Sequence, residues 1–273
     1  MANLIRSAKS GSDWSVNELL AYRITISSLS PDQFFRFEAD PSLDHMDPAL
    51  FTAPPGASDI QLSENTAEYL SYLDIARVPT EGGFIDDFAR ETLRLLHYSN
   101  RNIILSTRYI IPLTICGETN RTAQTDMCLL HRSTLILLVY KTLSDRTDAE
   151  PQVVADAIAA FQFNNRKRES WGLVPLKSMT IPCITMSGTR PTFYLVPVSQ
   201  ALSTAVATGQ NPPTETNVSK CVTALKHITG PHRYRASEGM EDTEYRKLAL
   251  RRFLAFKMEA LFHWVNIMHD VEV

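Results

Sequence analysis

The pattern of apolar and polar residues predicts a helix, three strands and a second helix in the middle of the chain. Residues 84–98 place Phe, Ile, Ala and Leu at helical spacing, which gives this segment one apolar face. The next segments are rich in Ile, Leu, Val, Thr and Tyr, as strands are, and cover residues 106–116, 123–131 and 134–143. Residues 150–164 again carry apolar residues on one helical face.

A hairpin and a long helix are predicted after this central part. Residues 179–186 and 192–198 have the composition of strands, and the turn-forming sequence between them contains Gly188. Residues 242–269 repeat Leu, Met and Val every three or four positions, which predicts a helix. With the first of these strands, the predicted core order is α-β-β-β-α-β.

The N-terminal part has a weaker pattern. Residues 14–26 and 31–37 are compatible with helical or mixed structure, and residues 40–60 are rich in Pro, Asp, Ala and Ser, which favours an extended loop. A short helix is predicted over residues 63–76, with Ser63 as its N-cap.

These elements predict a single α/β domain with a mixed sheet of about four to six strands flanked by helices. The chain has 273 residues, of which 44% are hydrophobic, and this is enough to form a substantial core. We expect residues 1–83 to form an acidic segment that wraps the core and residues 84–200 to form the core itself. Residues 201–273 are expected to form a linker and a long helix that packs on the core.

Composition excludes several classes of protein. The longest apolar run is strand-length, so no membrane-spanning helix is expected, and the first 14 residues lack the apolar core of a secretory signal. The cysteines are far apart, which favours buried free thiols over disulfides or zinc ligands and indicates an intracellular protein, cytoplasmic or nuclear; they are Cys116, Cys128, Cys183 and Cys221.

The formal net charge of −3 hides an uneven distribution. Residues 1–87 carry 5 basic and 14 acidic side chains, whereas residues 88–273 carry 22 basic and 16 acidic ones. A basic core could bind a polyanion such as nucleic acid, although a surplus of this size also occurs on ordinary solvated surfaces.

Two charged residues in the apolar strands are candidates for chemistry. If residues 123–131 and 134–143 form a hairpin around Arg132 and Ser133, Asp126 lies opposite Val139 and on the same face as Lys141. The alternative is that the acid and the lysine mark solvated or ion-paired strand ends.

The order of elements, with Asp on the second strand and Lys on the third, resembles the PD-(D/E)XK nuclease-like superfamily. The stretches that carry the resemblance are residues 84–88, 125–129, 137–141 and 150–165. They also resemble a family of proteins from mushroom-forming (basidiomycete) fungi. The likeness to the fungal family extends over most of the chain, whereas that to the superfamily covers only about residues 84–198.

The resemblance implies a divalent-metal-dependent nuclease, with Mg²⁺ or Mn²⁺ held by carboxylates and a lysine that orients the attacking water. Carried over, Asp126 is a metal ligand and Lys141 the catalytic lysine. Glu91 is the candidate carboxylate of the preceding helix, with Asp86 and Asp87 as substitutes nearby. Gln152 opens the following helix, where the superfamily often has a polar residue close to the site.

One position departs from the superfamily pattern. The residue two before the lysine is Val139, and a valine cannot bind a metal. Asp156, one turn beyond Gln152 on the same helical face, could supply the missing carboxylate. Alternatively, the chain keeps the scaffold without the activity and serves as an effector-like interaction or regulatory module with a protein partner. Whether the protein is an enzyme therefore stays open, as does a third reading, a small-molecule pocket beside the sheet.

Basic residues elsewhere offer weaker candidates. Arg166, Lys167 and Arg168 follow the second core helix and could contact a nucleic-acid backbone or lie in solvent. Arg246 and Arg252 in the C-terminal helix are expected on its solvated face, or along a nucleic-acid groove.

Overall fold

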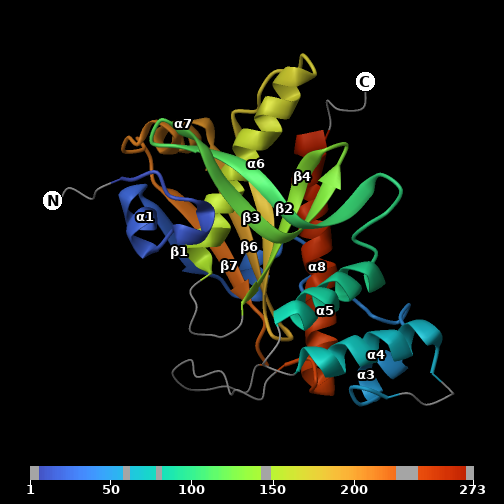
Figure 1. Ribbon diagram of the computed structural model, residues 1–273. Helices are drawn as coiled ribbons and strands as arrows, with labels where there is room; N and C mark the ends of the chain where they lie inside the picture. Colours follow the sequence, from blue (N-terminus) through green and yellow to red (C-terminus); the bar gives the residue numbers. More distant parts are fainter. Residues whose placement is uncertain (1–5, 58–61, 78–81, 143–148, 226–238, 269–273) are drawn as a thin grey trace.

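The computed structural model describes residues 6–57, 62–77, 82–142, 149–225 and 239–268 (Figure 1). Within these residues the strands form one seven-stranded mixed sheet in the order β1-β7-β6-β5-β4-β3-β2. The β1/β7 and β4/β5 pairs are parallel and the other pairs are antiparallel. The strands are β1 (Ile24–Ser28), β2 (Ile103–Ile115), β3 (Glu118–His131), β4 (Thr134–Thr142), β5 (Ser178–Ser187), β6 (Arg190–Ser199) and β7 (Thr216–Val222).

Helices cover both faces of the sheet. Phe193 of β6 packs its ring against α8, whereas Lys220 of β7, which pairs with the next residue Tyr194, forms an ion pair with Glu150 of α6. Because successive strand residues point to opposite faces, α8 and α6 lie on opposite sides. The helices are η1 (Gly11–Asp13), α1 (Val16–Ala21), α2 (Pro31–Phe34), α3 (Ala49–Thr52), α4 (Glu64–Ala76), α5 (Gly82–Leu95), α6 (Glu150–Ser170), α7 (Gln200–Thr208) and α8 (Thr243–Met268).

The predicted α/β class and core order are confirmed. The order α-β-β-β-α-β corresponds to α5, β2, β3, β4, α6 and β5. The long C-terminal helix is present as α8, and Ser63 caps α4 by accepting the Thr66 N–H at 3.3 Å. The ends of two predicted elements, residues 143 and 269, lie outside the described residues.

The sheet is larger than predicted because the N-terminal and C-terminal parts of the chain each add a strand, β1 and β7, at the same edge of the sheet. β1 comes from the segment 14–26, for which helical or mixed structure was expected, and β7 comes from the expected C-terminal linker. These two strands pair in parallel, so each supplies the backbone hydrogen-bond partners of the other. Several polar residues in both segments leave them without a clear alternation of apolar and polar positions.

The N-terminal segment is tied to the core by arginines of α8. Arg246 is fully buried and donates through Nη1 to the carbonyl oxygens of Leu50 and Ala53, each at 2.9 Å. Arg252 donates to the carbonyl oxygen of Ala39 at 2.8 Å. The expectation that these arginines lie on a solvated face was therefore wrong, because buried loop carbonyls from the N-terminal segment need hydrogen-bond donors.

In the part of the chain that the structure describes, we find no helix with the length and apolarity needed to span a membrane. The four cysteines are free thiols, and three of them are buried.

Candidate functional site

Lys141 lies between two carboxylates at the end of β4. Its ammonium group contacts Asp86 Oδ2 from α5 and lies 3.5 Å from Asp126 Oδ1 of β3. The side chains of all three residues are about three-quarters buried. The structure thus brings together the acid and the lysine predicted from the sequence, and it adds an acid from the helix that precedes the three strands.

Asp126 reaches Lys141 by a different register from the one predicted. The pairing next to the turn is the expected one, but a bulge between Leu129 and Leu130 shifts it by one residue, so that Val139 lies opposite Met127. Asp126 was therefore wrongly placed opposite Val139. Its carboxylate instead accepts the backbone N–H of Lys141 through Oδ2 at 2.9 Å.

The backbone and the hydrogen bonds beside this contact are irregular. Arg108 of β2, which lies between the registered pairs on either side of Asp126, has a φ of 52°. The Thr125 hydroxyl donates to the carbonyl oxygens of Val139 and Met127, at 2.9 and 2.6 Å. Side-chain hydrogen bonds therefore continue the β3/β4 connection where the regular ladder stops.

The helix carboxylate at the site is Asp86, not Glu91. Glu91 is buried, but its carboxylate is held by Arg94 with contacts of 2.6 to 3.0 Å. Asp87 forms an ion pair with Arg90 at 3.0 Å. Of the three acids considered in α5, Asp86, one of the two named as substitutes, is the one that meets Lys141, because its position on the helix faces the end of β4.

Burial and the ion pair act on the site in opposite directions. Burial raises the pKa of Asp86, and the charge of Asp126 adds to this effect, while Lys141 offsets part of it. Burial lowers the pKa of Lys141, but its contacts with Asp86 and Asp126 outweigh this, and the net shift is upward. The lysine is therefore a firmly protonated counter-ion for two acids and not a ready proton acceptor.

Asp156 lies on α6 in a sealed position. The residue is fully buried, and within the described residues neither carboxylate oxygen has a hydrogen-bond partner of normal geometry. Burial raises the pKa of Asp156 well above its usual range; the facing side chains of Tyr140 and Gln152 offset only part of this, and the charge of Asp126 adds to it. Asp156 is thus electrostatically coupled to Asp126 and is favoured in the protonated, neutral form.

Gly11 of η1 closes the space beside Asp156. A β-carbon at position 11 would come within 2.1 Å of Asp156 Oδ1 and 3.3 Å of Ala123. Only glycine, which has no side chain, lets the backbone at position 11 come this close to Asp156. The sequence gives no signal for this contact, because a glycine in a weakly patterned N-terminal segment looks like an ordinary loop residue.

Gln152 lies at the start of α6 beside this buried acid. Its Nε2 donates to the carbonyl oxygen of Gln124 at 3.3 Å, so the side chain links α6 to β3. It is close enough to Asp156 to favour the charged form of that carboxyl. The predicted position near the site is therefore where the residue lies, although its hydrogen bond goes to the backbone.

The residues present do not fit a resident divalent metal ion as they stand. Among the described residues no group of three or more His, Cys, Asp or Glu side chains is arranged to hold one. Val139 is 1% exposed and contributes only apolar contacts to the core. The Lys141 ammonium occupies the space between Asp86 and Asp126 and neutralises the charge that a cation would otherwise balance.

The basic triplet at the end of α6 is used within the fold. Arg168 is buried and donates from Nε to the carbonyl oxygen of Val174 at 2.9 Å, so it cannot contact a nucleic-acid backbone as predicted. Arg166 donates to the carbonyl oxygen of Pro112 at 2.9 Å, and Lys167 lies over the ring of Phe163. Only Arg166 and Lys167 stay accessible for the predicted role.

Comparison with known proteins gives no relative from which a function could be inferred. Neither a protein-family model nor a curated protein matches this chain.

Proposed function

We propose that this protein is a non-catalytic interaction or regulatory module built on a PD-(D/E)XK-like scaffold. The observation that carries the proposal is the position of the Lys141 ammonium between Asp86 and Asp126. In a metal-dependent nuclease the carboxylates hold the cation and the lysine faces the water; here the lysine itself balances the carboxylates.

The replacement of a carboxylate by Val139 supports the same proposal. Asp86, Asp126 and Lys141, from three elements, together carry a net charge of −1, which is a weak attraction for a hydrated divalent ion. Asp156, which is electrostatically coupled to Asp126, is sealed beneath Gly11 and favours its neutral form. The free thiols fit an intracellular location, in the cytoplasm or the nucleus.

The second candidate is a Mg²⁺- or Mn²⁺-dependent nuclease that hydrolyses phosphodiester bonds. It is favoured by the approach of Asp86, Asp126 and Lys141 from the three elements that the superfamily resemblance implies. Arg166 and Lys167 would then be accessible to a nucleic-acid backbone. For this function Lys141 would have to leave Asp86 before a cation could enter.

Calorimetry and a cleavage assay separate the two functions. Mn²⁺ is titrated into the full chain, and DNA and RNA in single- and double-stranded form are incubated with the protein and Mn²⁺. We expect neither heat of binding in the micromolar range nor cleavage. Binding and cleavage that are lost in Asp126→Ala and kept in Asp87→Ala, an acid that forms an ion pair with Arg90, would establish the nuclease instead.

A second experiment restores the missing acid. Val139→Glu supplies the carboxylate two residues before the lysine, and Val139→Leu is the control for disturbing a fully buried position. A gain of Mn²⁺ affinity in Val139→Glu alone is expected if the scaffold lost its metal through this position. Equal Mn²⁺ affinity in the wild type and in Val139→Glu would contradict the role assigned to Val139.

A further inference from the structure

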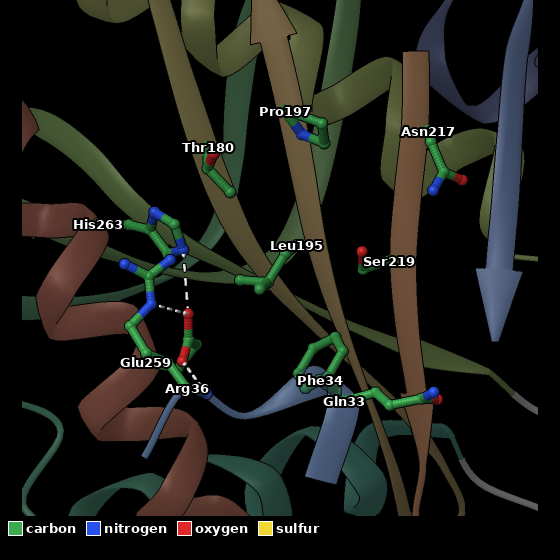
Figure 2. A pocket seen from close by; sticks show the side chains of 10 residues that line it. All are labelled: Gln33, Phe34, Arg36, Thr180, Leu195, Pro197, Asn217, Ser219, Glu259 and His263. Atoms are coloured by element: carbon green, nitrogen blue, oxygen red, sulfur yellow. Dashed lines mark hydrogen bonds and ion pairs between the residues drawn. The ribbon is translucent and has the colours of Figure 1, made fainter. Parts of the chain in front are cut away.

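A hollow of about 410 Å³ lies on the α8 face of the sheet, between β5, β6, β7 and α2 (Figure 2). The aromatic packing of α8 ends just before it: Phe193 is fully buried against Phe253 and Phe256, whereas Leu195 and Pro197, further along β6, are only half-buried. The volume falls within the range of about 300–1,000 Å³ that small-ligand sites occupy. The hollow exists because α8 covers only part of this face.

The floor of the hollow combines an aliphatic strip with hydroxyl groups on both sides. Thr180 pairs with Pro197 across β5 and β6, and Ser219 pairs with Leu195 across β6 and β7. Paired residues of neighbouring strands point to the same face of a sheet. The strip formed by Leu195 and Pro197 is therefore flanked by the Thr180 side chain on one side and the Ser219 side chain on the other.

Asn217 adds an oriented amide to this floor. Its Oδ1 accepts hydrogen bonds from the hydroxyls of Ser27 at 2.8 Å and Thr25 at 3.4 Å in the neighbouring strand β1. The carboxamide oxygen is thereby turned toward β1, and Figure 2 shows the nitrogen on the side of Ser219. The Asn217 amide is thus set to donate a hydrogen bond to a molecule in the hollow.

On the α8 side of the hollow, Glu259 is held by contacts with Arg36 and His263. The carboxylate of Glu259 is 2% exposed, accepts the backbone N–H of Arg36 at 2.9 Å, and lies 3.7 Å from Arg36 Nε and 3.3 Å from His263 Nε2. The Arg36 guanidinium also stacks over Phe262 at 3.6 Å. The charges of Arg36 and Glu259 balance, so this wall offers polar groups without an unpaired cation that would select an anion.

From this arrangement we infer that the hollow binds a neutral polyhydroxylated ligand, a mono- or disaccharide in chemical class. A pyranose ring has an apolar C–H face and a rim of hydroxyls. The C–H face fits the strip of Leu195 and Pro197, and the rim hydroxyls meet Thr180, Ser219 and the amide of Asn217. Arg36, whose side chain is half-exposed, can donate to hydroxyls at one end of the ring.

The proposed ligand site is separate from the charged cluster at Lys141. Lys141 pairs with Met186 of β5, and Thr180 lies six residues away along the same strand. At about 3.3 Å per residue the two sites are about 20 Å apart. Failure of either proposal therefore leaves the other unaffected.

Saturation-transfer difference NMR on the full chain tests the inference. The probes are glucose, cellobiose, maltose and chitobiose, with adenosine monophosphate and inorganic phosphate as anionic comparisons. We expect saturation transfer to the ring C–H protons of at least one saccharide. Chemical shifts of phosphorus resonances report on the two anions.

Variants then assign the signal to the hollow. Asn217→Ala and Thr180→Ala act on opposite sides of the strip, and Asn102→Ala removes an exposed amide beside the other sheet edge as the matched control. The saccharide signal should fall at least threefold in both pocket variants and stay unchanged in the control, with thermal unfolding confirming that all three fold. No signal from any saccharide, a signal that the pocket variants leave unchanged, or binding of the anions alone would each overturn the inference.

Discussion

Gly11 and Asp156 are in direct contact, although they come from the N-terminal segment and the second core helix. The distance of 2.1 Å from a β-carbon built at position 11 to Asp156 Oδ1 leaves no room for a side chain. Gly11 is buried, and its φ is not in the left-handed region, so the contact itself and not the backbone conformation demands glycine. The acidic N-terminal segment is thereby part of the candidate site and not only a wrap around the core.

Gly11→Ala should destabilise the protein by about 1–3 kcal/mol, the range found for overpacking a tight interior. Urea unfolding followed by circular dichroism measures the change. In an Asp156→Ala background the carboxylate that clashes with the new methyl group is absent, so the same substitution should cost less than half as much. An equal loss of stability in both backgrounds would show that the Gly11–Asp156 contact is not the cause.

Asp156→Asn should flatten the dependence of stability on pH. Burial raises the pKa of Asp156 in the folded state, so the folded protein holds a proton that the unfolded chain releases above its ordinary pKa near ~3.9. This contribution to stability is complete below that pH and is lost as the pH rises toward the folded-state pKa, by at most about 1.4 kcal/mol per pH unit. Denaturant midpoints between pH 4 and pH 8 measure the slope.

The control for this slope is Asp87→Asn, which changes a half-exposed acid on α5. The wild type and Asp87→Asn should show the same downward trend above pH 4, while Asp156→Asn should lack part of it. A parallel pH profile for all three proteins would mean that Asp156 is ionised in the folded state.

Lys141→Met should leave two partly buried carboxylates without a counter-ion. Its Asp86 partner already has a raised pKa, and removal of the ammonium should raise it further. We expect a loss of about 1–3 kcal/mol at neutral pH that shrinks toward pH 4, because Asp86, whose pKa is raised, takes up a proton as the pH falls and then needs no counter-ion. Denaturant unfolding at both pH values checks this, with Lys177→Met, an exposed lysine, as the control.

Arg246→Met should release the N-terminal segment from α8. The guanidinium donates to Leu50, Ala53 and Met240, and the substitution leaves these carbonyl oxygens buried without their donor. A loss of about 2–4 kcal/mol is expected, together with faster proteolytic cleavage within residues 40–57. The neighbouring Lys247→Met serves as control; equal cleavage rates for the two variants would argue against the clamp.

The buried Arg246 and the β1/β7 pair show what the sequence could not reveal. Helical spacing correctly predicted α8, but it assigned Arg246 to the solvated side because a charged residue on a helix is normally exposed. Its burial depends on carbonyl groups about 195 residues earlier in the chain. In the same way, β1 and β7 form strands by pairing with each other, and the local sequence of either segment does not indicate this pairing.

For the candidate site, too, the sequence determined some features and the tertiary structure determined others. Periodicity and residue type determined that Asp126 and Lys141 belong to adjacent strands and that the core runs α-β-β-β-α-β. The tertiary structure decided the one-residue shift at the bulge, the choice of Asp86 over Glu91, and the sealing of Asp156 by Gly11. Local patterns determine which face a residue occupies within its own element. The partner of a buried charge is set by elements that meet only after the chain has folded. A desolvated charge is stabilised by whichever donor or counter-ion the packing brings within reach.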